Sequence, residues 1–416
     1  MFLSLALALT SPTSVDGFSG LKSAVAACGD LNGDGVPDLL LASRDYPHPE
    51  CVWLLSGKDG SVLRTLKGRV LGDGFGERVT GIGDVDADGI PDIAVGSFGK
   101  DPAVPVKTDW RAVSFGPYTR IFSGKSGDIL MDLPSDGDIA LARDVDADGR
   151  ADLLFSGPGL AVTLRYGDPA KPKLEIRDTD GPIVGRFGDA VSWTGDLDGD
   201  GHPDIAASTV GIRTNIDGSP GKDCFAVTAF SSRDGHRLWN YLDTTDGEGG
   251  ASILRKLSDV DGDGVDDLLV GLEDCYVATL SGKTGENIRL LGAARRDVVY
   301  AFASSLDVIG DVDKDGFPDW VVGALEWLPR PFFDLGTAGV YSGKKGTRIL
   351  DLEYSYDFGF DVSAIGDVDG DGVPDVAEYV QGSDSLFVGA AKVRSGKTGE
   401  VIWLKTLPEL RAAAPR

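Results

Sequence analysis

Histidine, cysteine and basic charge are all scarce in this sequence. Its 416 residues include three histidines and four cysteines, and 40 basic residues stand against 66 acidic ones. Four cysteines in so long a chain do not make a disulfide scaffold, so we expect buried free thiols at Cys28, Cys51, Cys224 and Cys275. The lack of a basic stripe argues against nucleic acid as a partner. No apolar run approaches the ~20 residues that a membrane-spanning helix needs.

The three histidines give no sign of a catalytic centre. His48 lies in a proline-flanked loop, His202 lies in an acidic loop, and His236 lies in an expected hairpin turn. No set of nucleophile, base and orienting acid can be assembled around them, so no catalytic residue is predicted. Tyrosine, arginine or lysine could serve a lyase instead, which leaves an enzymatic function open.

What the sequence does contain is a repeated acidic loop. Residues 367–375 read Asp-Val-Asp-Gly-Asp-Gly-Val-Pro-Asp, with carboxylates at loop positions 1, 3, 5 and 9. Calcium takes about six to eight oxygen ligands from flexible loops of this kind. The glycine at position 6 allows a sharp turn, after which the backbone carbonyl of position 7 can also face the ion. The pattern therefore predicts a calcium site.

This loop occurs seven times, beginning at residues 30, 84, 144, 196, 259, 311 and 367. Only Asn32 replaces a carboxylate, so we expect the first loop to bind calcium least tightly. Recurrence at a nearly constant spacing indicates a repeat array. The predicted ligands, five in each loop, are Asp30, Asn32, Asp34, Val36 and Asp38; Asp84, Asp86, Asp88, Ile90 and Asp92; Asp144, Asp146, Asp148, Arg150 and Asp152; Asp196, Asp198, Asp200, His202 and Asp204; Asp259, Asp261, Asp263, Val265 and Asp267; Asp311, Asp313, Asp315, Phe317 and Asp319; Asp367, Asp369, Asp371, Val373 and Asp375.

The charge of the chain lies almost wholly in these loops. The formal net charge is -26, and the loops hold 27 of the 66 acidic residues, four in each of six loops and three in the first. The remaining 39 acidic residues nearly balance the 40 basic ones. Up to seven bound Ca²⁺ ions would bring the net charge to about -12, so we predict structural metal sites rather than a generally acidic surface.

The segments around each loop predict an all-β fold. In the last repeat, residues 358–365, 374–380, 386–393 and 401–407 read as four antiparallel strands, and the turn at residues 395–399 precedes the fourth. The third repeat departs from this turn pattern. Seven four-stranded sheets arranged radially form a seven-bladed β-propeller with one calcium loop in each blade. The turn, whose glycines suit positive φ angles, begins at Ser56, Ser123, Ser232, Ser281, Ser342 and Ser395.

The repeats run without a linker, so one propeller domain is expected over residues 17–410, with a tail at 411–416. Residues 1–16 allow two interpretations. Their short apolar run favours a degenerate or truncated secretory signal. The strict alternation of leucines at positions 3, 5, 7 and 9 is instead typical of a half-buried strand that closes the propeller.

The blades resemble FG-GAP repeats, also called VCBS-type repeats, of the integrin α-chain propeller and related bacterial proteins. In this family a Phe-Gly pair precedes the calcium loop and Gly-Ala-Pro follows it. The Phe-Gly pairs at 75–76, 187–188 and 358–359 match the first element, and the dipeptides at 96–97, 157–158 and 323–324 match the second in part. The resemblance implies a calcium-bearing module for binding or adhesion that works outside the cytoplasm.

Strand direction places the calcium loops and the Ser-Gly turns on one face and the variable loops on the other. The longest variable loops are rich in aromatic and arginine side chains, which often anchor ligands but also fold over blade ends as small cores. The candidates for a ligand face are Tyr46, His48, Trp110, Arg111, Phe115, Tyr118, Trp327, Arg330, Phe332 and Phe333.

Three functional classes follow. The favoured one is a monomeric, non-catalytic binding or adhesion module for a protein or glycan, located outside the cell, at its surface or in the periplasm. Extracellular calcium modules work with dissociation constants of about 0.1 to 1 mM, and nothing in these loops indicates tighter binding. The alternatives are a carbohydrate-active enzyme such as a polysaccharide lyase, and a purely structural surface protein.

Overall fold

A computed structural model describes residues 24–43, 51–69, 73–97, 117–135, 138–157, 160–168, 170–178, 183–214, 220–243, 251–272, 276–292, 299–326, 335–356, 360–380 and 389–413. The segment 1–16, with its two interpretations, lies outside these residues. So do nine of the ten ligand-face candidates, all except Tyr118.

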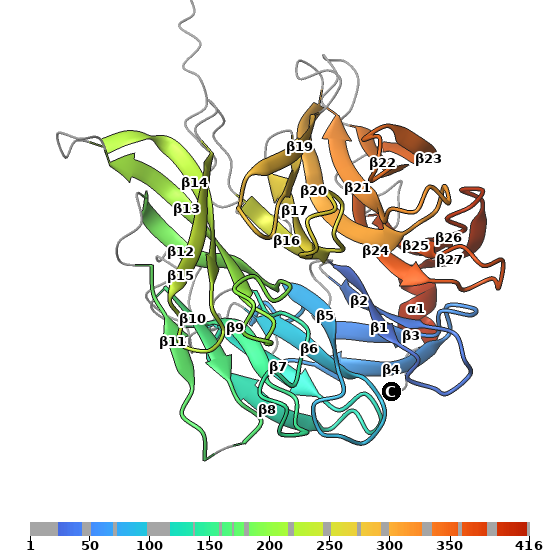
Figure 1. Cartoon of the computed structure of the whole chain (residues 1–416). Coiled ribbons are helices and arrows are strands. Elements are labelled where there is room, and N and C mark those ends of the chain that lie inside the picture. Colours follow the sequence, from blue (N-terminus) through green and yellow to red (C-terminus); the bar gives the residue numbers. More distant parts are fainter. Residues whose placement is uncertain are drawn as a thin grey trace, which may run out of the picture.

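The fold is a seven-bladed β-propeller, as the sequence predicts (Figure 1). Within each sheet the strands follow one another in chain order and pair antiparallel. The first three blades contain β1 (Val25–Gly29), β2 (Asp38–Ser43), β3 (Cys51–Leu55) and β4 (Val62–Lys67); β5 (Arg78–Gly83), β6 (Asp92–Ser97), β7 (Tyr118–Phe122) and β8 (Ile129–Leu133); β9 (Leu153–Gly157), β10 (Ala161–Arg165) and β11 (Leu174–Ile176).

The other four blades contain β12 (Ile183–Trp193), β13 (Ile205–Thr214), β14 (Pro220–Phe230) and β15 (Arg237–Asp243); β16 (Ala251–Leu257), β17 (Asp267–Leu272), β18 (Tyr276–Leu280) and β19 (Asn287–Gly292); β20 (Val299–Gly310), β21 (Asp319–Glu326), β22 (Leu335–Tyr341) and β23 (Arg348–Tyr356); β24 (Phe360–Gly366), β25 (Asp375–Val380), β26 (Ala390–Arg394) and β27 (Val401–Thr406). The last blade begins and ends its strands within four residues of the predicted positions.

Burial explains the order of strands within a blade. Strand β17, which reads Asp-Leu-Leu-Val-Gly-Leu, is buried at every residue because neighbouring blades cover both of its faces. Strand β27 has one buried residue, Trp403, among exposed and partly buried ones, because it is the outermost strand of its sheet. Continuous apolar runs thus form the interior strands of a blade, and more exposed runs form its edge.

Most of the apolar clusters join neighbouring blades. One cluster combines Val270 of the fifth blade with Val227 of the fourth, and another combines Leu269 of the fifth with Trp320 of the sixth. The ring closes where the last blade meets the first, shown in red and blue in Figure 1. There Trp403 Nε1 donates to the Gly57 carbonyl at 2.5 Å.

The Phe-Gly pairs serve this packing between blades. Phe75 packs edge-on against Phe122 of its own blade, with ring centroids 6.1 Å apart. Gly76 has a φ of 91°, and a Cβ at this position would lie 3.1 Å from the Ala42 Cβ of the preceding blade. Phe187 and Gly188 repeat the arrangement against the third blade, whereas residues 358–359 lie outside the described residues.

Two features differ from the sequence prediction. In the described part of the third blade, three strands form the sheet, and two isolated bridges stand where its first strand was expected, Ile139 to Phe155 and Arg143 to Asp152. The chain also ends in a helix, α1 (Leu407–Ala413), where strand and tail were expected. Leu407 and Leu410 are buried in the core that joins the first and last blades, which explains why the helix forms.

Cysteine mostly behaves as expected where it is described. No disulfide forms among the described cysteines, and Cys28 and Cys224 are buried, whereas Cys51 is partly buried. Burial raises the pKa of the Cys51 thiol to about 11. Cys275 lies outside the described residues. Among those residues, no helix has the length and apolar character needed to cross a membrane.

Candidate metal centres

The acidic loop of the fifth blade shows the local geometry. Asp259 Oδ1 accepts the backbone N–H of Gly262 at 2.6 Å, and its Oδ2 accepts that of Gly264 at 2.8 Å. Asp263 Oδ1 accepts the N–H of Val265 at 2.9 Å. These bonds curl the loop so that carboxylate oxygens of Asp259, Asp261 and Asp263 lie within 4.8 Å of one another.

The same turn geometry recurs in every loop. The glycine at position 6 has a φ between 82° and 90° in all seven, a conformation that favours glycine over other residues. Position 4 also has a positive φ, although Ala87, Ala147 and Lys314 occupy it in three loops. Comparable carboxylate groups form in other blades, including Asp84, Asp86 and Asp92; Asp144, Asp146 and Asp152; Asp196, Asp198 and Asp204; Asp311, Asp313 and Asp315.

The aspartate at position 9 has a second role that the sequence did not indicate. In the fifth blade Asp267 is fully buried. Its Oδ2 accepts the N–H of Val260 in the same loop at 2.8 Å, and its Oδ1 accepts the N–H of Gly282 in the Ser-Gly turn at 3.0 Å. The position-9 carboxylate therefore ties the acidic loop to the turn. All seven blades repeat both bonds, at Asp38, Asp92, Asp152, Asp204, Asp267, Asp319 and Asp375.

Burial perturbs these carboxyl groups. Desolvation raises the pKa to about 6 for Asp38, Asp204, Asp267 and Asp375, and neighbouring carboxylates add to the effect. The backbone N–H groups that they accept act in the opposite direction. The negative charges of the loop carboxylates lie close together and repel one another. A bound cation would compensate these charges and so remove the repulsion.

The Ser-Gly turn packs directly on the loop. A Cβ on Gly396 would lie 1.8 Å from the carbonyl oxygen of Pro374, at position 8 of the loop. The first glycine of the turn is therefore required because the loop backbone lies too close to leave room for a side chain. The second, Gly399, has a φ of 75° and meets the sequence prediction of a positive angle.

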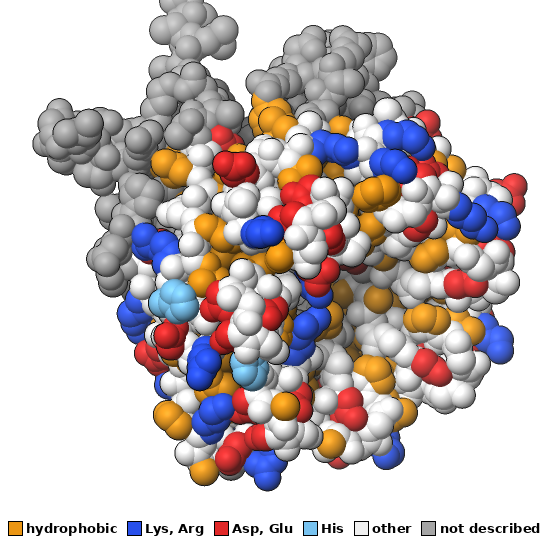
Figure 2. Space-filling model, viewed as in Figure 1, with side chains coloured by type: hydrophobic (Ala, Val, Ile, Leu, Met, Phe, Trp, Pro, Cys, Tyr) orange, Lys and Arg blue, Asp and Glu red, His pale blue; other side chains and the backbone are white. Residues whose placement is uncertain are grey.

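Lysines of the turns lie over the carboxylates. Lys345 Nζ is 3.0 Å from Asp313 Oδ2 and 3.4 Å from Asp315 Oδ2, and Lys397 Nζ is 3.6 Å from Asp371 Oδ2. These lysine side chains are more than half exposed, so each pair contributes little to stability. Figure 2 shows the result as acidic groups interspersed with basic side chains.

The donor set fits calcium. The oxygens of three carboxylates in close proximity suit a hard cation. The one histidine in a loop, His202, directs its ring Nδ1 to the Val145 carbonyl of the neighbouring loop, 2.5 Å away, and so does not offer a nitrogen ligand to the loop. When bound, calcium would hold the loop carboxylates ionised and fix the loop on the turn.

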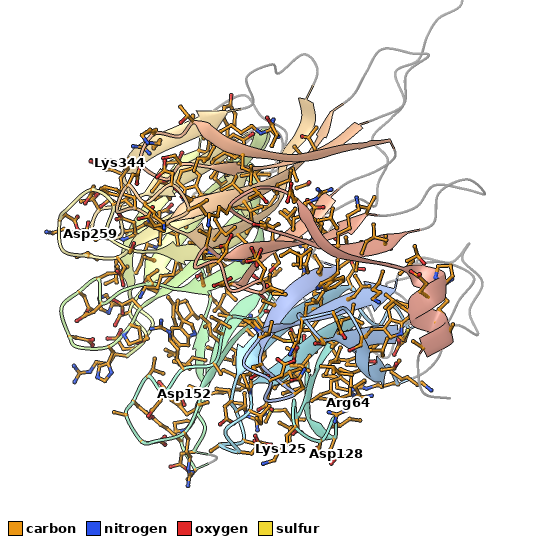
Figure 3. The ribbon with its side chains drawn as sticks, turned by 90° about the vertical axis from the view of Figure 1, so that its right-hand side faces the viewer. Arg64, Lys125, Asp128, Asp152, Asp259 and Lys344 are labelled. Atoms are coloured by element: carbon orange, nitrogen blue, oxygen red, sulfur yellow. The ribbon has the colours of Figure 1, made fainter. Side chains whose placement is uncertain are left out.

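The loops lie together on one side of the propeller. Figure 3 shows Asp152 and Asp259 on this side, together with Lys344 of a turn. Neighbouring loops touch: a Cβ on Gly310, just before the sixth loop, would meet Pro374 of the seventh at 3.4 Å. A Cβ on Gly366, just before the seventh loop, would likewise lie 3.1 Å from Pro37 of the first loop. The seventh and first loops therefore also touch where the ring closes.

Comparison with known proteins agrees with this geometry. The FG-GAP-like repeat family matches residues 30–95, which contain the first two acidic loops. The sequence is 28% identical over 228 residues to integrin alpha-PS2 of Drosophila melanogaster, covering 47% of this chain and 15% of that protein. It is 34% identical over 97 residues to integrin alpha-V of Gallus gallus, covering 21% of this chain and 9% of that protein. These matches support FG-GAP-like repeats similar to those of integrin α-chains.

The matched regions span less than a sixth of these relatives. Among solved structures, Saccharomyces cerevisiae Sqt1 is similar with a TM-score of 0.48 and 10% identity, covering 93% of this chain and 86% of that one.

One of the ligand-face candidates, Tyr118, lies within the described residues and is buried, as the alternative of a small packed core allows. Tyr118 opens β7 and is 2% exposed. Its hydroxyl donates to Asp73 Oδ2 at 2.6 Å, and the Arg69 guanidinium lies 4.0 Å above its ring. Tyr118 therefore belongs to the interior of the second blade and not to a ligand face. The other candidates, Tyr46, His48, Trp110, Arg111, Phe115, Trp327, Arg330, Phe332 and Phe333, lie outside the described residues.

Proposed function

We propose that this protein is an extracytoplasmic, calcium-stabilised and non-catalytic module for binding or adhesion. The observation that carries the proposal is the double role of the position-9 aspartate, which links each acidic loop to the turn of its own blade. Calcium bound in a loop would therefore stiffen one end of the blade. The result is a rigid scaffold whose opposite face is free to vary.

The curated relatives support the adhesive part of the proposal. Both are named as integrin α-chains, and the chain shares repeats with them. The calcium requirement supports a location outside the cytoplasm, because loops of this kind match the roughly millimolar calcium of extracellular modules. We propose a protein or glycan as the partner, with aromatic and arginine side chains of the variable loops as its anchors.

The calcium part is tested by thermal unfolding in millimolar calcium, in magnesium and in chelator. We expect calcium to raise the melting temperature and magnesium to raise it far less, because magnesium demands shorter and more regular octahedral coordination. The Asp259→Asn variant should lose part of the calcium response, and the exposed Lys283→Ala variant should keep it. Identical melting curves in calcium and chelator would contradict the proposal.

The binding part is tested by screening glycans and matrix proteins with the calcium-loaded protein. For any ligand found, the Trp110→Ala/Trp327→Ala double variant should bind at least tenfold more weakly and keep its calcium response. Unchanged affinity in a folded double variant would place the partner elsewhere on the propeller.

A further inference from the structure

The inner strands of the blades enclose a central cavity. Neither the acidic loops nor the described parts of the variable loops form its wall. Its volume is about 430 Å³, and all seven blades contribute to its wall. A cavity of this size matches the lower range of small-molecule sites. Hydroxyl groups of Thr80, Ser192, Ser304 and Ser363 are interspersed among apolar residues of the wall.

The charge of this cavity is opposite to that of the protein. Its wall contains the cationic side chains of Arg78, Arg143, Arg255 and Lys256 but only two carboxylates, Asp138 and Asp307. The chain as a whole has a net charge of -26. A positive interior within an acidic protein attracts anions at short range, because the low-dielectric walls focus the field of the cationic groups.

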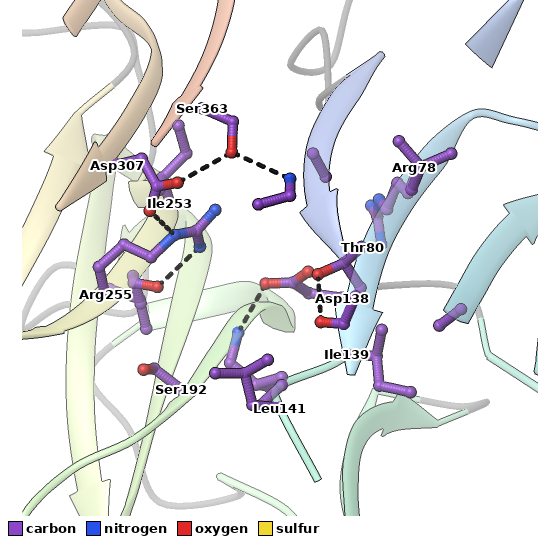
Figure 4. Close-up of a pocket in the computed structure, with 18 of the residues that line it drawn as sticks. Arg78, Thr80, Asp138, Ile139, Leu141, Ser192, Ile253, Arg255, Asp307 and Ser363 are labelled. Carbon is purple, nitrogen blue, oxygen red and sulfur yellow. Dashed lines mark hydrogen bonds and ion pairs between the residues drawn. The ribbon is translucent and has the colours of Figure 1, made fainter. Parts of the chain in front are cut away.

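Two of the four cationic side chains in the wall form ion pairs within the protein. Arg255 Nε lies 3.3 Å from Asp307 Oδ1, and Asp307 Oδ2 accepts the Ser363 hydroxyl of the next blade at 3.1 Å (Figure 4). Lys256 Nζ lies 2.5 Å from Asp266 Oδ2. Both cations are therefore compensated, and the Arg255 contact also ties the fifth blade to the sixth.

Arg78 and Arg143 form no such ion pair among the described residues. Burial lowers the pKa of the Arg78 guanidinium, whereas the nearby carboxylates of Asp138, Asp189 and Glu77 favour its charged form and so act in the opposite direction. The Nε of Arg78 is buried and has no hydrogen-bond partner among the described residues. Figure 4 places Arg78 across the cavity from Arg255, with Asp138 between them, and Asp138 accepts the Val191 N–H rather than pairing with Arg78. Nearby Asp189 is paired with Arg186 at 2.7 Å. In the described part of the chain, the side chain of Arg143 makes no hydrogen bond or ion pair.

The irregular third blade creates this arrangement. Residues 138–143 form isolated bridges in place of a continuous inner strand, and they supply Asp138, Leu141 and Arg143 to the wall. The Leu141 side chain is 60% exposed. Its carbonyl accepts Trp193 Nε1 at 2.7 Å, which holds the segment at the wall of the cavity.

We propose that the central cavity binds a small organic anion that carries one carboxylate or phosphate group. Arg78 and Arg143 hold the anionic group, because a guanidinium donates paired N–H bonds to such oxygens and a buried donor without a partner is costly. The hydroxyls of Thr80 and Ser192 bind the polar body of the molecule. This site is separate from the calcium loops and from the variable-loop face, and it does not depend on the function proposed above.

The test uses glucuronate and methyl phosphate as probes, with glucose as the neutral control, at a fixed free calcium concentration. We expect at least one anion to raise the melting temperature in a saturable manner and to give a dissociation constant by calorimetry. Glucose should have no effect. A response to glucuronate alone identifies a carboxylate ligand, and a response to methyl phosphate alone identifies a phosphorylated one. No response to either anion at about 10 mM, or an equal response to glucose, would overturn the proposal.

The matched variants are Arg78→Gln and Arg143→Gln in the cavity and Arg165→Gln on the outside of the third blade. Either cavity variant should weaken anion binding by about ten- to a hundredfold, which is the usual loss for a charge-assisted hydrogen bond. Arg165→Gln should bind like the natural protein, because Arg165 is exposed and lies away from the cavity wall.

A stability measurement without anion separates binding from folding. Arg78→Gln removes a buried charge whose Nε has no hydrogen-bond partner among the described residues, so the variant should unfold at a similar temperature while it loses the anion response. If Arg78→Gln fails to fold, Arg143→Gln carries the test alone. Anion binding of natural strength in the folded Arg143→Gln variant would then overturn the assignment.

Discussion

Without calcium, the folded protein should lose stability as the pH rises from about 4.5 to about 7. Burial raises the pKa of Asp38, Asp204, Asp267 and Asp375 to about 6 from an ordinary value of 3.8. The folded chain therefore keeps protons that the unfolded chain has already released. Such groups stabilise the fold fully below the unfolded pKa, and this contribution is lost as the pH rises through the folded pKa.

The size of the effect follows from the pKa shifts. One pKa unit corresponds to about 1.4 kcal/mol, so each of the four groups should cost about 2 kcal/mol of unfolding free energy between pH 4.5 and 7. If independent, these four groups together contribute about 8 kcal/mol, and the raised pKa values of Asp92, Asp152 and Asp319 act in the same direction. Carboxylates with lowered pKa values, such as Asp30 and Asp259, titrate below this pH range. They therefore do not change the pH dependence of the unfolding free energy within it.

The assay is urea unfolding in chelator at several pH values across this range. The Asp267→Asn variant removes one of the four groups and should reduce the total pH dependence by about 2 kcal/mol. A hydrogen bond with Asp234 raises the pKa of His236 above the ordinary histidine value, so His236→Gln serves as the control for histidine titration and should change the pH dependence little, because this side chain is exposed. Saturating calcium should abolish the dependence, since a bound cation holds the carboxylates ionised. A calcium-free protein whose stability is level or rises with pH would refute the reasoning.

Three further outcomes are expected. Replacing Ala87, Ala147 or Lys314 with glycine should raise the unfolding free energy by about 0.5 to 1 kcal/mol each, because these residues have positive φ angles. The reverse change at the same loop position, Gly370→Ala, should lower it by a similar amount. Urea unfolding that ranks these variants in the reverse order would contradict this prediction. Gly396→Ala should cost about 3 kcal/mol or more, because its Cβ would overlap the Pro374 carbonyl, whereas the neighbouring Lys397→Ala should cost little. Asn32→Asp should tighten calcium binding at the first loop, and an unchanged or weaker site-resolved affinity would show that charge does not limit that site.

Sequence reasoning reached the repeated parts of the fold because each rests on local chemistry. The calcium-loop pattern, the four-strand order and the positive φ at Gly399 all follow from residues close together in the chain. The helix α1 also had a local signal that could have found it: Thr406 and Glu409 stand three residues apart, and Glu409 Oε2 accepts the Thr406 N–H at 2.8 Å.

The features that were missed depend on contacts between distant segments. Nothing local distinguishes Asp267 from the other loop aspartates, yet this buried carboxylate accepts the backbone N–H of the turn 15 residues later. Gly282 looks like an ordinary turn glycine, but its role is close approach to the Asp266 carbonyl. The burial of Tyr118 likewise depends on Asp73, 45 residues away in the chain. Such roles become visible only when the blades are assembled.

The number of calcium ions bound per chain tests the central claim most directly. Native mass spectrometry in a volatile calcium buffer, checked by calorimetric titration, should approach seven ions per chain, with the first loop filling last. Each site should add about 1.4 kcal/mol to the unfolding free energy when free calcium is tenfold above its dissociation constant. A folded chain that binds no calcium at millimolar concentration would contradict the account, because its seven acidic loops would then be ordinary turns.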